Sequence, residues 1–105
     1  MITEAAKIYK VLGNGIRISI LYFLREQNDY VDVTSIISAT QLAQSVVSKH
    51  LGVLYRYQLV TKKRVGTRIL YRLDDPHIIE MVDDMLNHVK HEIKGEPHPT
   101  KMYDK

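Results

Sequence analysis

The sequence contains no cysteine and no tryptophan, and only one phenylalanine and three prolines among its 105 residues. Without cysteine, the chain can form neither a disulfide, nor a thiolate metal site, nor a thiol redox switch. It has no apolar run close to the roughly 20 residues that a membrane-spanning helix needs. The first residues, MITEAAKIYK, lack the apolar core of a signal peptide. We therefore expect a single domain that stays in the cytoplasm.

Positive charge is concentrated in one part of the chain. The formal net charge is +3 with histidine neutral, and basic residues cluster between positions 62 and 72, whereas acidic residues gather at 74–84. A net charge of this size is weak evidence for a polyanionic partner, but a basic cluster on one segment is typical of contact with nucleic acid.

Apolar spacing predicts helices over four segments in the first half of the chain, namely 3–12, 16–27, 33–39 and 43–57. Asn14 is positioned to cap the second of them, which is the most apolar and is predicted to lie at the centre of the core. The third and fourth helices are separated only by a short turn. This arrangement is typical of a helix-turn-helix.

The second half of the chain changes period. Alternation over 59–73, with Gly66-Thr67 at its middle, predicts a β-hairpin. A last helix is predicted to begin at Asp75-Pro76 and to run to about Lys94. The predicted fold is mainly α with a small β-hairpin, a winged helix-turn-helix over residues 1–94, followed by a flexible tail over 95–105.

A winged helix-turn-helix would place the 43–57 helix in the major groove of DNA and the cations of the hairpin on phosphates. Each pattern alone has an ordinary structural explanation, as a helical corner or a solvated hairpin, but together and in this order they favour DNA binding. His50 is predicted to lie on the surface of the 43–57 helix. The candidate DNA-binding residues are Gln44, Ser45, Val46, Ser48, Lys49, Lys62, Lys63, Arg64 and Arg68.

The segments VLGNGIRISILYFL and LAQSVVSKHLGVLYRYQLVTKKRVGTRILYRL resemble the corresponding parts of ArsR/SmtB-type winged-helix repressors. Two positions depart from the family pattern: Thr67 at the wing tip, and Ala43 where a capping serine is usual. The resemblance implies a homodimer joined through its first and last helices. It also implies double-stranded operator DNA with inverted-repeat symmetry as the partner.

The last helix contains candidate metal ligands at both of its ends: Asp75, His77, His88 and His91. His77 and His88 are eleven residues apart, or ~16 Å at a rise of ~1.5 Å per residue, so one helix cannot bring both to one ion. Two antiparallel copies of the helix can, and twofold symmetry then generates two sites. Three imidazoles and a carboxylate suit tetrahedral Zn(II) or Co(II). The spacing Asp-x-His-x10-His-x2-His also matches the zinc or cobalt site of ArsR/SmtB sensors.

These patterns predict a zinc-responsive repressor that binds its operator as a metal-free homodimer and is released by Zn(II). The resemblance suggests an allosteric relay from His88 to the Lys49 carbonyl. Two alternatives stay open. The metal could be Co(II), or Ni(II) with further ligands from Glu92 or His98, or the histidines could be surface residues of a repressor that senses no metal. An enzyme is not expected, because a closed four-ligand set leaves no open position for substrate.

Overall fold

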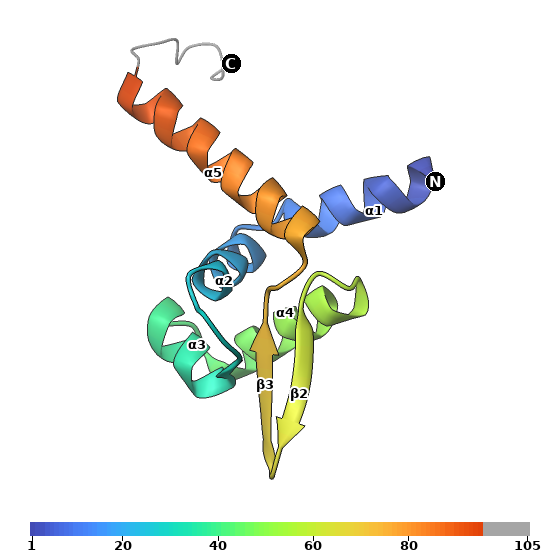
Figure 1. Cartoon of the computed structure of the whole chain (residues 1–105), viewed down its shortest axis with the longest axis vertical. Coiled ribbons are helices and arrows are strands. Elements are labelled where there is room, and N and C mark those ends of the chain that lie inside the picture. The colour runs from blue at the N-terminus through green and yellow to red at the C-terminus, as the bar shows by residue number, and fades with distance from the viewer. Residues whose placement is uncertain (96–105) are drawn as a thin grey trace.

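A computed structural model of the chain describes residues 1–95, and the side chains of residues 1–90. Within this range the helices and strands follow one another as α1 (Ile2–Leu12), α2 (Gly15–Arg25), β1 (Val31–Asp32), α3 (Val33–Thr40), α4 (Gln44–Arg56), β2 (Thr61–Val65), β3 (Arg68–Arg72) and α5 (Pro76–Gly95). Each predicted helix and the predicted hairpin are present, and the fold is mainly α with a small antiparallel sheet (Figure 1).

Local sequence signals explain where the helices begin. The side chain of Asn14 accepts hydrogen bonds from the backbone N–H groups of Ile16 (3.0 Å) and Arg17 (3.1 Å), which confirms the predicted cap of α2. By contrast, α4 begins after Ala43 with no side-chain cap. The start of α4 is therefore held by the packing of its apolar face and not by a local side chain.

The sheet has one strand more than the hairpin. β2 and β3 pair antiparallel around a turn in which Gly66 adopts a φ of +66°, as a two-residue hairpin requires. The short strand β1 pairs with the other edge of β3, giving the order β1-β3-β2. A strand of two residues is too short to show an alternating pattern, and for this reason the sequence did not reveal it.

The core forms around α2, as predicted. Its residues Ile20, Leu21 and Leu24 are fully buried, and they pack with the buried face of α4. Burying an aliphatic side chain of this size stabilises a fold by roughly 1.5–3 kcal/mol relative to exposure. This packing fixes the orientation of α4 relative to the rest of the domain.

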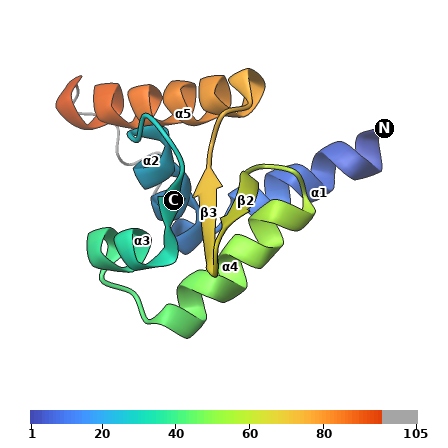
Figure 2. The ribbon, with the colours of Figure 1, turned by 60° about the horizontal axis from the view of Figure 1, so that its bottom comes forward.

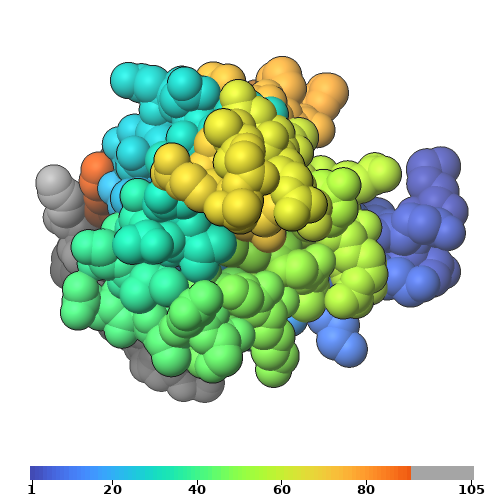
Figure 3. Space-filling model, turned by 90° about the horizontal axis from the view of Figure 1, so that it is seen from below, coloured from blue at the N-terminus to red at the C-terminus, as the bar shows by residue number. Residues whose placement is uncertain are grey.

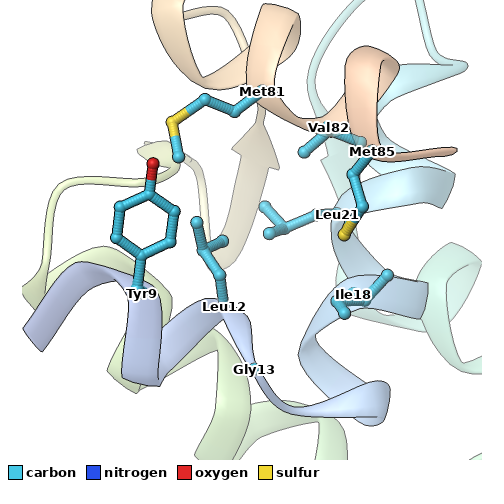
Figure 4. Close-up of a pocket in the computed structure, with 8 residues that line it drawn as sticks. All are labelled: Tyr9, Leu12, Gly13, Ile18, Leu21, Met81, Val82 and Met85. Carbon is cyan, nitrogen blue, oxygen red and sulfur yellow. The ribbon is translucent and has the colours of Figure 1, made fainter. Parts of the chain in front are cut away.

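Helices α1 and α5 reach outward from this core on the side opposite the tip of the hairpin (Figure 1). Val11 is the buried residue of α1, whereas Ile2 and Tyr9 are 83% and 66% exposed. An apolar cavity of about 280 Å³ lies between α1, α2 and α5 and is lined by residues such as Tyr9, Leu21 and Met85 (Figure 4). Both outer helices thus present apolar surface. Within residues 1–95, every helix is too short or too polar to cross a lipid bilayer.

Candidate nucleic-acid interface and metal ligands

The turn between α3 and α4 is fixed at both of its ends. Asp32 caps α3, and its carboxylate accepts bonds from the backbone N–H and the hydroxyl of Ser35, both at 2.9 Å. At the other end, Gln41 adopts a left-handed conformation with φ of 61°, and its N–H donates to the carbonyl of Ile37. A reversal of this kind lets α4 follow α3 at an angle, which is the geometry of a helix-turn-helix.

Except at His50, the two faces of α4 divide as the sequence predicts. Val47, Leu51 and Leu54 are buried in the core. Gln44, Ser45, Ser48 and Lys49 are exposed, and Val46 is partly exposed. In Figure 3, which views the molecule from the side of the hairpin tip, α3, α4 and the hairpin form one continuous surface. The exposed side chains at the start of α4 therefore lie on a surface that a DNA groove can approach.

The hairpin presents its cations to solvent. All five residues of β2 are exposed, among them Lys62, Lys63 and Arg64. The ammonium of Lys62 lies 4.2 Å from the ring centroid of Tyr55, and that of Lys63 lies 4.4 Å from the ring centroid of Tyr30. A cation over an aromatic ring is oriented without being neutralised. These charges stay available for phosphates.

Arg68, the fourth predicted cation of the hairpin, is engaged within the protein. Its guanidinium donates to the carboxylate of Asp32 at 2.5 Å. The backbone N–H of Ser35, followed by Arg68, lowers the pKa of Asp32. Because Asp32 also caps α3, this ion pair joins the hairpin to the helix-turn-helix.

His50 corrects one sequence expectation, because it is buried and not on the surface of α4. Only 7% of the residue is exposed, and its Nδ1 accepts a hydrogen bond from Nε of Arg17 at 3.1 Å. Burial, followed by the charges of Arg17 and Lys49, lowers the pKa of His50. The helical period could have shown this, since position 50 lies three residues after Val47 and four before Leu54.

At the start of α5 the structure brings two of the predicted metal ligands together. Asp75 accepts hydrogen bonds at Oδ1 from the N–H groups of His77 (2.8 Å) and Ile78 (3.4 Å). The Nδ1 atom of His77 lies 3.6 Å from the same oxygen, and the His77 side chain is 90% exposed. An accessible imidazole beside a carboxylate is a fitting half of a tetrahedral Zn(II) or Co(II) site.

The other predicted ligands belong to the far end of α5. His88 is exposed on that helix, eleven residues or ~16 Å beyond His77. The side chain of His91, together with Glu92 and His98, lies outside the described residues. Among the side chains that are described, no three potential ligands come close enough to hold one ion. The two halves of the predicted site are therefore separate within one chain.

An ion pair that the sequence did not reveal fixes α5 to the core. Arg25 of α2 donates from two nitrogens to the two carboxylate oxygens of Asp83, at 2.7 and 2.9 Å. The hydrogen bond from Arg25 lowers the pKa of Asp83. The two residues are 58 positions apart, so no local pattern could have paired them.

Comparison with known proteins identifies similar chains. A family model described as "Bacterial regulatory protein, arsR family" matches residues 14–62. The HTH-type transcriptional repressor SmtB of Mycobacterium tuberculosis is 33% identical over 88 residues, which are 84% of this chain and 64% of SmtB, slightly less than two thirds of that relative. The regulator NmtR of the same organism is 34% identical over 84% of this chain and 72% of its own length. These relatives are transcriptional regulators and not enzymes.

Solved structures agree with the architecture. The homodimeric winged helix-turn-helix domain of Mb0332 from Mycobacterium bovis, a possible ArsR-family regulator, superposes with a TM-score of 0.79 at 26% identity, covering 93% of this chain and 89% of that domain. The antimony-specific transcriptional repressor AntR gives a TM-score of 0.78 at 26% identity over 89% of this chain and 83% of its own. The fold is therefore a winged helix-turn-helix.

Proposed function

This chain belongs to the arsR family of bacterial regulatory proteins, and from that premise we propose that it is a transcriptional repressor controlled by a metal ion. In this proposal a metal-free homodimer binds operator DNA of inverted-repeat symmetry, and Zn(II) bound between its subunits releases it. The observation that supports the DNA-binding part most directly is the exposed start of α4 beside the unneutralised cations of β2.

Each group on this surface would have a distinct role on DNA. Gln44, Ser45 and Ser48 have hydrogen-bonding side chains that can read base edges, and Val46 can contact a thymine methyl group. Lys49 and the cations of β2 would contact phosphates and release counterions, so affinity should fall as salt rises. Arg68 would act differently from the other hairpin cations, because its ion pair with Asp32 already uses its charge.

The metal-binding part rests on the two separated halves of the ligand set. Asp75 and His77 of one subunit would meet His88 and His91 of the other when two α5 helices pack antiparallel. The exposed imidazole of His77 and its short distance to Asp75 support this arrangement. Bound Zn(II) would supply a tetrahedral link between the two helices. Two equal sites would form in each dimer.

Release from DNA requires that the metal favour a dimer geometry that DNA does not. A ligand shifts a conformational equilibrium only by its difference in affinity for the two states, and DNA must weaken metal binding by the same factor. We propose that His88 transmits the change by donating its second ring N–H toward the Lys49 carbonyl of α4. Such a bond from a metal-ligating histidine would orient the ring as well.

The test measures the DNA affinity of the protein with and without Zn(II) by fluorescence anisotropy. The probe is a duplex that the wild-type protein selects from a random pool. We expect tight binding without metal, a large loss of affinity with Zn(II), and no Zn(II) effect in His88→Ala. The variant Asn87→Ala, one residue away on α5, serves as the matched control and should respond like wild type. Equal affinities with and without Zn(II) in the wild type would refute control by Zn(II).

A repressor without metal sensing is the second candidate, and one observation favours it. Both backbone hydrogen bonds to Asp75 Oδ1 are accounted for by helix capping alone. Calorimetric titration of Zn(II) into the metal-free protein decides between the two candidates, because two tight Zn(II) sites per dimer would exclude the second. The absorption spectrum of the Co(II)-loaded protein then reports the coordination number. A tetrahedral spectrum supports Zn(II) or Co(II), and a six-coordinate spectrum would point to Ni(II).

A further inference from the structure

A pocket of about 370 Å³ lies where α1, α2 and α4 meet, and basic residues dominate its polar lining. Lys7 and Lys10 of α1 contribute two cations, and Arg17 of α2 and Arg56 of α4 contribute two more. Its remaining lining is apolar and includes Tyr57. No carboxylate lines the pocket. None of these four cations is among the candidate DNA-binding residues or the predicted metal ligands.

The positive charge of this pocket is not balanced within the described part of the chain. The ion pairs among the described side chains involve Arg25, Arg68, His77 and the N-terminal amine. None of them involves a pocket cation. Glu4, the acidic residue of α1, is bound to the N-terminal amine at 2.7 Å. Four like charges around one cavity repel one another, and an anion placed between them would remove that repulsion.

Arg17 gives the pocket a fixed element. Its Nε donates to Nδ1 of the buried His50 at 3.1 Å, and its Nη1 donates to the Val11 carbonyl at 3.3 Å. Both acceptors are uncharged groups, so they orient the half-buried guanidinium without neutralising it. A charge withdrawn from water and left unpaired is costly. The arrangement holds Arg17 ready for an anion at a smaller entropic cost than a free side chain would have.

We propose that this pocket binds a phosphate of the DNA backbone, at a position separate from those bound by the start of α4 and the hairpin. The proposal rests on the proposed function, because the DNA held by α4 is the source of the phosphate. α1 lies beside the C-terminal part of α4 (Figure 2), and both are visible in the view from the hairpin side (Figure 3). Arginine and lysine donors are well suited to phosphate oxygens, and such interactions position a protein without reading sequence.

The experiment compares the variants Lys7→Gln/Lys10→Gln and Arg56→Gln with the matched control Lys90→Gln, an exposed lysine of α5. All substituted residues of the pocket variants are exposed, so folding should be preserved, and circular dichroism checks this. DNA affinity of the metal-free proteins is measured against salt on the wild-type-selected duplex. We expect the slope of log affinity against log salt to become shallower by about 0.9 for each phosphate that the variant no longer neutralises. Sequence preference should not change.

A second measurement locates the phosphate. Duplexes that carry one neutral methylphosphonate at successive positions are bound by each protein. At the phosphate that the pocket binds, the methylphosphonate should weaken DNA binding by the pocket variants less than binding by wild type and Lys90→Gln, because each variant retains only some of the pocket cations. Pocket variants whose slopes and methylphosphonate profiles match those of Lys90→Gln would overturn the proposal.

Two other outcomes are distinct from that one. Calorimetry with inorganic pyrophosphate tests for a free anion as the ligand. Tight pyrophosphate binding that is abolished in the pocket variants, combined with unchanged salt slopes, would overturn DNA as the source. Failure of the wild-type protein to bind any duplex at low salt would refute the proposed function itself, and this inference with it.

Discussion

At the scale of single residues, His50 has the most consequential environment in the described part of the chain. It joins α4 to α2 through the hydrogen bond from Arg17, and that bond requires an unprotonated Nδ1. Burial and the charges of Arg17 and Lys49 lower the pKa of His50 below the usual 6.5. The unfolded chain therefore takes up a proton at a higher pH than the folded chain does.

The sign of the pH dependence follows from this shift. The contribution of His50 to the free energy of unfolding should be fully present above about pH 6.5 and should be lost as the pH falls from there through the folded pKa. His50→Asn replaces Nδ1 with an oxygen acceptor that does not titrate, so it should lose less stability between pH 7.5 and 5.5 than wild type. Urea unfolding at both pH values measures this. The other histidines are common to both proteins, and equal losses would contradict the prediction.

Residue chemistry also shows where sequence reasoning was sufficient and where it was not. Asn14, Asp75 and Gly66 behave as predicted, because caps and turns depend on neighbours within a few positions. The burial of His50 was also predictable, because position 50 shares the helical face of Val47 and Leu54, and the expectation of a surface residue overlooked that period. The Arg68–Asp32 ion pair was not predictable, because it joins residues 36 positions apart and depends on how the elements pack.

At the scale of elements, α4 starts with a weak cap. Ala43 has the extended backbone conformation of a cap residue but no side-chain oxygen to accept a hydrogen bond. Ala43→Ser should satisfy one more N–H of the first turn and raise the free energy of unfolding by about 1 kcal/mol. Urea denaturation measures the change. The control Ala43→Val changes the same residue without adding a hydrogen-bond acceptor. An equal increase in its free energy of unfolding would show that capping is not the cause.

At the same scale, an ion pair attaches α5 to α2. The two hydrogen bonds between Arg25 and Asp83 hold α5 against α2. Asp83→Asn should lower the urea midpoint and increase amide exchange along α5, because a neutral amide cannot form the charge-assisted pair with the guanidinium. The neighbouring carboxylate of Asp84 is exposed and supplies the matched control Asp84→Asn. Equal effects of the two substitutions would mean that the ion pair does not hold the helix.

The helices and the hairpin were predictable from the sequence because they have strong periods and clear caps. The strand β1 was not, since two residues show no period, and only its pairing with β3 defines it. The candidate site divides in the same way. The exposed and buried faces of α4 follow from the helical period, whereas the meeting of Asp75 with His88 of another copy depends on subunit packing. That part remains a prediction.

At the scale of the whole molecule, the apolar surfaces of α1 and α5 predict association with a second copy. Met85 and Tyr9 line the cavity between these helices and are both exposed. Met85→Lys should place a charge in the expected interface and shift the protein toward monomer. Light scattering after size-exclusion chromatography measures the molar mass. Val65→Lys introduces the same charge at an exposed apolar residue of the hairpin, and dissociation of that control as well would contradict this interface.

The double role of Asp32 has a mechanical consequence. One carboxylate holds the first turn of α3 and also the arginine of β3, while β1 adds its backbone pairing to the same strand. The hairpin and the helix-turn-helix are thereby joined, and we expect them to move together. If an inducer releases this protein from a duplex, we expect the movement to occur between the two subunits and not between the hairpin and the helix-turn-helix of one subunit. Each subunit would then rotate as a rigid body.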